Sequence, residues 1–327
     1  MTPRGVKMDE TRFGSVGKRL LAGLALAAGL TACESDFSPA SRVTDFRLIA
    51  VQADAPYAAP GQTVKLSTLS HEPFGRKVTW GWSTCVLPKS ATAPGCMEKI
   101  AEDAKASGKP PAFEVGENRT TYETTIPADV LANLSREGRT GALVGVLTVG
   151  CPGALSLADP ASVPPGGLPF HCVEDGTGKE LPYDRWVVSL KRVYVRETDR
   201  NQNPPIGDVL FDGATWGETE VKEVTPCDGD DNAFDDCSGG EHEVTLRVAS
   251  GAVESGTDES GSSFTERVVV QYYATEGTFE FDVRTAESPK TRWKARKQDV
   301  GRTLTMWFVA RDNRGGVSWT SRSVKVK

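Results

Sequence analysis

The residues best suited to chemistry lie in one acidic segment, 227–237, whose sequence is Cys-Asp-Gly-Asp-Asp-Asn-Ala-Phe-Asp-Asp-Cys. Calcium binds about six to eight converging oxygen atoms. The side chains that could supply them are Asp228, Asp230, Asn232, Asp235 and Asp236. The first three have the alternating spacing of an EF-hand loop, but Ala233 replaces the turn glycine and Gly239 replaces the bidentate glutamate. A calcium site of another geometry is therefore one hypothesis, and no other cofactor is expected.

A second interpretation of this segment needs no metal. Aspartate and asparagine are frequent in turns because their side chains bond to nearby backbone groups. The segment would then be a solvated acidic hairpin tip, closed by a disulfide between its two cysteines. We favour this interpretation over the calcium site.

Motifs for catalysis are absent from the sequence: it has no Gly-x-Ser-x-Gly elbow, no His-Glu-x-x-His motif and no phosphate-binding glycine loop. The three histidines, His71, His171 and His242, are far apart in the chain. Glu241 and Glu243 flank His242, which suits metal or acid-base chemistry but is also typical of a charged strand edge that prevents aggregation. We therefore expect a protein that is not an enzyme.

Cys33, near the amino terminus, has a distinctive chemical context. Lys18 and Arg19 precede an uncharged stretch that ends in Leu30-Thr31-Ala32-Cys33. A basic region, a short apolar region and a small-residue cleavage site are typical of a signal peptide, and the apolar run is shorter than the about 20 residues that span a bilayer. The last four residues resemble a bacterial lipobox. The resemblance implies that residues 1–32 are removed and that Cys33 carries lipid.

Lipid on Cys33 would anchor the protein in the bacterial cell envelope. Each buried CH₂ contributes about 0.8 kcal/mol, so two or three acyl chains form a durable anchor. Glu34 stands in place of the aspartate that some Gram-negative bacteria use as an inner-membrane retention signal, which favours the outer membrane. An ordinary signal peptide with a chance cysteine is the alternative.

The six other cysteines are expected to form disulfides, because an even number suits an oxidising compartment. They lie as neighbours along the chain, as Cys85 with Cys96, Cys151 with Cys172, and Cys227 with Cys237. Six cysteines allow many pairings, and the sequence does not choose among them rigorously. We expect the three local pairs rather than a zinc site, which would need cysteine and histidine at ligand spacing.

The balance of charge is acidic. The chain of 327 residues has a formal charge of -6, and removal of residues 1–32 changes it to -9. Nucleic acid is not an expected partner, since surfaces that bind it are basic. The expected partners are the membrane, through the lipid, and an unidentified envelope protein or glycan.

Alternating apolar and polar residues predict β-strands over most of the chain. The predicted strands are 46–51, 64–68, 78–85, 122–126, 143–149, 186–195, 209–211, 243–249, 268–273, 279–283, 304–310 and 317–325. Trp80 and Trp82 share one face of their strand, so at least one is expected in the core, with an exposed sugar-stacking platform as the alternative.

Between these strands the sequence predicts two short helices, over Cys96–Ser107 and Ala128–Glu137. Loops rich in proline, glycine or serine are predicted between Cys151 and Cys172 and at 255–263. The polar stretch 198–205 ends in two prolines and predicts a domain boundary.

The predicted fold is all-β, with two tandem immunoglobulin-like β-sandwiches at 43–200 and 201–327 and one or two short helices in the first. A signal peptide at 1–32 and a tether at 33–42 precede them. This order predicts that the first sandwich lies nearest the membrane and the second outermost. Segments 141–149 and 301–309 lie at similar places before the closing strand of each half, which suggests a duplication.

Two segments resemble bacterial surface lipoproteins with immunoglobulin-like or PKD-like domains. The run from Leu48 to Val64 is similar to their opening strand, Pro-Gly turn and second strand, and the run from Phe308 to Trp319 is similar to their final hairpin. The resemblance covers about a tenth of the chain and implies a fold rather than an activity. Antibody-type domains join their sheets with a disulfide beside a core tryptophan, whereas these cysteines lie in local pairs.

The function expected from these features is that of a membrane-anchored envelope protein that binds, adheres or acts as a scaffold through its sandwich domains. The alternative is a carbohydrate-binding or calcium-dependent recognition module associated with an extracellular enzyme system.

Overall fold

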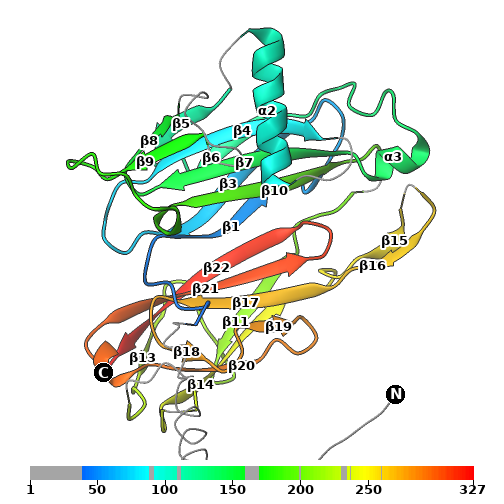
Figure 1. The fold of residues 1–327 in the computed structure, drawn as a ribbon. Coiled ribbons are helices and arrows are strands. Elements are labelled where there is room, and N and C mark those ends of the chain that lie inside the picture. Colours follow the sequence, from blue (N-terminus) through cyan, green and yellow to red (C-terminus); the bar gives the residue numbers. More distant parts are fainter. Residues whose placement is uncertain are drawn as a thin grey trace, which may run out of the picture. The chain divides into compact units, whose positions relative to one another are not determined.

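Two β-sandwiches follow one another along the chain (Figure 1). The computed structural model describes residues 39–87, 92–108, 112–158, 169–198, 200–229, 234–235, 237–258 and 260–327. The predicted signal peptide and Cys33 lie outside these residues. No helix within the described ranges is long and apolar enough to cross a membrane.

The first sandwich is built on two sheets. Its elements are β1 (Arg47–Ala53), β2 (Tyr57–Ala58), β3 (Thr63–His71), β4 (Thr79–Leu87), α2 (Ala93–Ser107), β5 (Glu114–Glu117), β6 (Thr121–Thr125), α3 (Arg136–Thr140), β7 (Leu143–Cys151), β8 (Ala154–Leu157), β9 (Phe170–Val173), η1 (Tyr183–Arg185) and β10 (Val187–Val195). One sheet has the order β1-β3-β6 and the other β2-β10-β7-β4-β5. Trp80 and Trp82 are both fully buried between the sheets, so both belong to the core.

The second sandwich has two five-stranded sheets. Its elements are β11 (Ile206–Phe211), β12 (Ala214–Thr215), β13 (Val221–Val224), β14 (Glu241–Val248), β15 (Ser255–Thr257), β16 (Ser263–Thr265), β17 (Val268–Ala274), β18 (Thr278–Phe279), β19 (Val283–Thr285), β20 (Thr291–Lys294), η2 (Lys297–Asp299), β21 (Thr303–Asp312) and β22 (Val317–Val326). The sheet orders are β12-β11-β14-β20-β18 and β13-β22-β21-β17-β19. The hydroxyl of Tyr272 accepts a hydrogen bond from the Leu246 amide across the core, 3.1 Å away.

Both sandwiches have the same strand connectivity. The order β1-β3-β6 corresponds to β11-β14-β20, and β2-β10-β7-β4-β5 corresponds to β13-β22-β21-β17-β19. In each, the last strand pairs antiparallel with the preceding long strand and parallel with a short early one. The all-β fold of tandem immunoglobulin-like sandwiches predicted from the sequence is therefore confirmed, and the shared order supports a duplication.

A small apolar cluster joins the two sandwiches, which together form one compact unit from Pro39 to Lys327. Its buried members are Val43, Ile49, Ala50, Trp307, Val309 and Val317. Gln52 Nε2 donates to the carbonyl of Val317 at 2.6 Å, and the guanidinium of Arg311 donates to that of Ile49 at 2.7 Å. Both apolar packing and polar bonds therefore link β1 to the β21–β22 hairpin.

Two predicted elements are wrong in position. The helix predicted over Ala128–Glu137 is a series of turns, and α3 begins only after Ser135, whose side chain accepts from the Gly138 amide. The strand predicted at 279–283 is divided into β18 and β19, which belong to different sheets because the chain crosses between them there.

Two predicted loops contain hairpins. In the loop predicted between Cys151 and Cys172, β8 pairs with β9, and Leu155 is buried against the sheet. Within 255–263, β15 pairs with β16 around a turn in which Asp258 Oδ1 accepts from the amides of Ser260 and Ser262. Proline and glycine content did not reveal these pairings, because partners outside each segment complete them.

Candidate functional site

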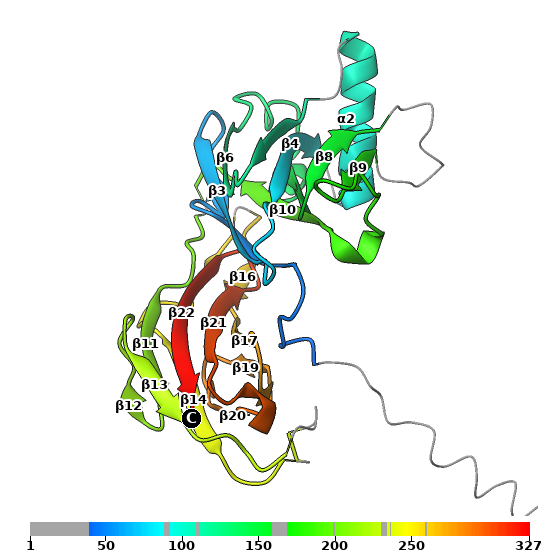
Figure 2. The ribbon, with the colours of Figure 1, turned by 90° about the vertical axis from the view of Figure 1, so that its left-hand side faces the viewer.

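An inserted layer covers the outer face of the five-stranded sheet in the first sandwich. It consists of α2 and the β8–β9 hairpin, which lie on the same side of β4 in Figure 2. The helix begins at Thr92, whose hydroxyl accepts from the Gly95 amide at 3.1 Å, and ends at Gly108 in the left-handed conformation. Cys96 and Ile100 form its buried face.

Two disulfides fasten this layer. Cys85–Cys96 joins β4 to α2, and Cys151–Cys172 joins the end of β7 to β9. Gly145 makes room for the first, because a Cβ at this position would lie 2.8 Å from Cys85 Sγ. The pairs are those expected from the sequence.

The layer has its own hydrophobic core. The buried residues are Cys85, Cys96, Ile100, Leu147, Val149, Cys151, Leu155, Phe170, Cys172 and Trp186. Phe113 meets Phe170 edge to face with ring centroids 4.8 Å apart. Thr79 Oγ1 donates to the Gly153 carbonyl at 2.6 Å and so fixes the start of the hairpin. The insertion is therefore packed and held at both ends.

The second sandwich has no such insertion at the equivalent place. Its β21 and β22 are joined by a tight turn in which Asp312 Oδ1 accepts from the amides of Arg314 and Gly316, at 2.8 and 2.7 Å. In the first sandwich, β7 and β10 are separated by residues 152–186. The two sandwiches share their strand order. The first has a long insertion between β7 and β10, whereas the second has a tight turn between the corresponding strands β21 and β22.

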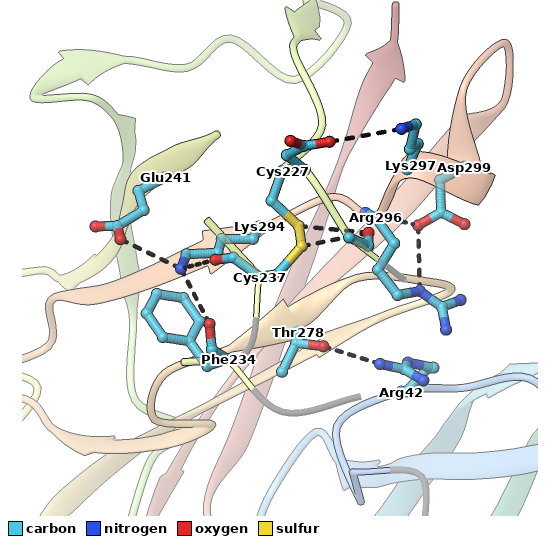
Figure 3. Close-up of a disulfide and its surroundings, with 12 residues drawn as sticks. Arg42, Cys227, Phe234, Cys237, Glu241, Thr278, Lys294, Arg296, Lys297 and Asp299 are labelled. Atoms are coloured by element: carbon cyan, nitrogen blue, oxygen red, sulfur yellow. Dashed lines mark hydrogen bonds and ion pairs between the residues drawn. A yellow bond between two sulfur atoms is a disulfide. The ribbon is translucent and has the colours of Figure 1, made fainter. Parts of the chain in front are cut away.

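The acidic segment of the second sandwich is organised around a lysine that the sequence analysis did not select (Figure 3). Cys227 and Cys237 are bonded, which places Phe234 beside β20. The buried Lys294 Nζ donates to the carbonyls of Phe234 at 3.0 Å and Cys237 at 2.6 Å. It also lies 3.3 Å from Glu241 Oε1 and 4.2 Å from the Phe234 ring centroid. The ammonium group is thus the cation that these oxygens bind.

The calcium candidates are only partly described. Asp228 is exposed and forms an ion pair with Lys297 at 3.5 Å, and Asp235 is exposed. Asp230, Asn232 and Asp236 lie outside the described residues. Within the described ranges, no group of three or more histidine, cysteine, aspartate or glutamate residues is arranged to hold a metal ion. Calcium binding stays a prediction.

His242 and its acidic neighbours are engaged with other side chains. His242 Nδ1 lies 2.8 Å from Asp212 Oδ2, and its ring stacks on Phe211. Glu241 pairs with Arg292 and Lys294, and Arg292 also binds Glu280. Hydrogen bonds from Arg292 and Lys294 lower the pKa of Glu241. This cluster forms a charged edge of ion pairs.

The histidines are not brought together. His71 lies beside Trp307, with ring centroids 5.0 Å apart, and burial lowers its pKa. His171 pairs with Glu180 at 3.1 Å. His242 belongs to the second sandwich. The described residues therefore do not bring two histidines into one site.

Comparison with known proteins carries no argument about the fold or the function of this chain. No protein-family model matches the chain, and no curated protein matches it. The D0-D1 domain of intimin is 7% identical with a TM-score of 0.20, covering 85% of this chain and 98% of that one. The tandem immunoglobulin repeats of Dlar are 9% identical with a TM-score of 0.23, covering 87% and 99%. The fold assignment rests on the strand order described above.

Proposed function

We propose that this protein is a lipid-anchored envelope protein, not an enzyme, that binds a partner through the inserted layer of its first sandwich. The observation that carries the proposal is the layer itself, because two disulfides and a separate apolar core hold α2 and the β8–β9 hairpin on one sheet. Binding residues are often carried on inserted segments that a rigid scaffold positions.

The outer surface of this layer is polar and charged. Glu98, Glu102 and Lys105 are exposed on α2, and Lys99 pairs with Asp103 one turn apart. Leu157 of β8, in the same layer, is also exposed. A mixed charged surface with an apolar residue suits a protein or a glycan of the cell envelope better than nucleic acid.

Anchoring is supported by the sequence before Cys33. Replacing Cys33 with serine tests it: the wild-type protein should sediment with membranes, and the variant should stay as unprocessed precursor or be released. Retention of a processed Cys33→Ser protein on the membrane contradicts the anchor.

Photo-crosslinking in intact cells tests the binding surface. A benzophenone amino acid replaces Glu102 in α2 or Leu157 in β8, and in the matched control it replaces the exposed Lys65 on β3. The proposal predicts the same discrete adduct from the first two positions and none from Lys65. Absence of that adduct, or equal adducts from all three, contradicts it.

A further inference from the structure

The end of the predicted tether, together with the residue that follows it, is hydrogen-bonded to the second sandwich. The Val43 amide donates to the Ala274 carbonyl at 2.8 Å, and the Ala274 amide donates to the Ser41 carbonyl at 2.9 Å. Arg42 therefore forms a parallel bridge with Ala274 at the end of β17. Ser41, Arg42 and Val43 are each at most 3% exposed. We name Ser41–Val43 the docked segment.

The side chain of Arg42 strengthens this docking. Its Nε donates to the Gly277 carbonyl at 3.2 Å, and a terminal nitrogen donates to Thr278 Oγ1 at 2.8 Å (Figure 3). Gly277 has a φ of 82°, which suits glycine and turns its carbonyl toward the guanidinium. Desolvation by burial, followed by the nearby charge of Arg296, lowers the pKa of Arg42.

The docking point lies at one end of the sandwich. In the pairing of β17 with β21, Ala274 is opposite Met306, whereas Val268 is opposite Asp312 at the far end. Asp312 begins the turn to β22, and there Lys191 Nζ of the first sandwich donates to the Gly315 carbonyl at 2.5 Å. The chain thus enters at the end of this strand pairing away from the turn that Lys191 contacts, next to Trp307, which His71 of the first sandwich contacts.

Chain length limits how far the anchor lies from this point. Ser41 is the eighth residue after Cys33, and a fully extended chain of eight residues spans at most about 29 Å. We infer that the docked segment holds the anchored end of the chain on the second sandwich, so that the second sandwich lies against the bilayer and the first is presented away from it. This inference rests on lipid attachment at Cys33. It reverses the order of domains expected from the sequence.

A second turn lies beside the docking point and would face the lipid headgroups. Arg302 pairs with Glu276, which follows the docked segment's partner Ala274, at 2.9 Å. Between η2 and Arg302, Val300 is 52% exposed, and Lys297 is exposed as well. An exposed apolar residue between two basic ones suits the interface of a membrane, where the apolar group contacts lipid and the charges meet headgroups.

Energy transfer to labelled lipid tests the orientation. The lipidated protein carries a donor dye on Val300→Cys, or on the control Glu102→Cys in α2, and is placed in phosphatidylethanolamine and phosphatidylglycerol vesicles with headgroup acceptors. We expect severalfold greater transfer from position 300 than from position 102. Equal transfer, or greater transfer from position 102, in vesicle-bound protein overturns the inference and leaves the anchor intact.

Hydrogen exchange of the same lipidated protein tests the docking independently of the dyes. Arg42→Ala and Thr278→Val should speed exchange of the Val43 and Ala274 amides by about tenfold or more, whereas Arg247→Ala, an exposed site in the same sandwich, should not. Arg42→Ala should also reduce the difference in energy transfer between dyes at positions 300 and 102. Unchanged exchange in both docking variants overturns the docking. Protein that fails to bind vesicles at all instead removes the anchor, and with it the orientation.

Discussion

The ammonium group of Lys294 lies 2.6 Å from the carbonyl oxygen of Cys237, inside the loop that the Cys227–Cys237 disulfide closes. The carboxylates of this loop suggested a calcium site, yet the described contacts converge on a buried lysine from β20. A lysine in this place donates hydrogen bonds to the backbone carbonyls of two buried residues, Phe234 and Cys237.

Replacing Lys294 with methionine should therefore destabilise the second sandwich. Two carbonyl groups would lose their donor, and each unsatisfied buried group costs about 1–3 kcal/mol, so the free energy of unfolding should fall by about 2–6 kcal/mol. Urea denaturation measures the change. Lys290→Met is the control, because Lys290 is exposed in its ion pair with Glu243 and should alter stability by less than about 0.5 kcal/mol. Equal effects of both substitutions would show that the carbonyl contacts contribute nothing.

Removal of the Cys151–Cys172 disulfide should loosen the inserted layer. Closing a loop of this length contributes about 3 kcal/mol by restricting the unfolded chain. The double variant Cys151→Ala, Cys172→Ala should lose about that amount in guanidinium unfolding and become susceptible to protease within β8 and β9. The Cys227→Ala, Cys237→Ala variant serves as a control, since it should leave the protease pattern of the layer unchanged. Wild-type resistance in the first variant would contradict a restraining role.

Trp82 should contribute strongly to the first core. It is fully buried, stacks on Tyr122 with ring centroids 5.5 Å apart, and donates from Nε1 to the Arg119 carbonyl at 2.9 Å. Trp82→Ala should lower the free energy of unfolding by about 3–5 kcal/mol. Phe74→Ala, at a side chain that is 64% exposed, should have little effect. Comparable losses from the two variants would argue against Trp82 as a core residue.

Lys191 should make the free energy of unfolding depend on pH in the alkaline range. Burial lowers the pKa of this lysine from 10.5 to about 8. Between these values the unfolded chain holds a proton that the folded protein has released, so the free energy of unfolding should rise with pH from about 8 toward 10. Below pH 8 both states are protonated, and the slope from this group disappears.

The measurement is the difference in stability between the wild type and Lys191→Met across pH 7–10. Subtracting the free energy of unfolding of the variant from that of the wild type removes the contribution of other groups. The difference should increase only above about pH 8. Lys65→Met, at an exposed position on β3, should give a flat difference. A flat difference for Lys191→Met as well would mean that this ammonium group is hydrated in the folded protein.

The strands were the most predictable part of this protein. In β4, β7 and β21, alternating or continuous apolar residues gave the element and its buried face, since period two suits only an extended chain with one side in a core. The segment 279–283 was not predictable in this way, because Phe279 is buried while Phe281 and Val283 are exposed. The alternation of apolar and polar residues in this segment gives no sign that the chain crosses from one sheet to the other.

The candidate sites were less predictable. Local spacing favoured the three cysteine pairs, because residues that are close in sequence meet without a large loss of chain entropy. Lys294 had no signal of its own, since it lies 57 residues from Cys237 and its partners are backbone carbonyls. The inserted layer was equally hard to predict, because Leu155 becomes a core residue only through its tertiary contact with Gly81.

By itself the sequence determined the class of fold and favoured the three local pairs of cysteines that the structure forms, because both follow from local patterns along the chain. It also carries the lipobox-like context of Cys33, which is local in the same sense and stays a prediction. Only the tertiary structure decided that Arg42 binds Gly277 and Thr278, more than 230 residues away. That contact depends on a glycine carbonyl, a threonine hydroxyl and a strand end brought together by folding, and no periodicity in the chain encodes their meeting.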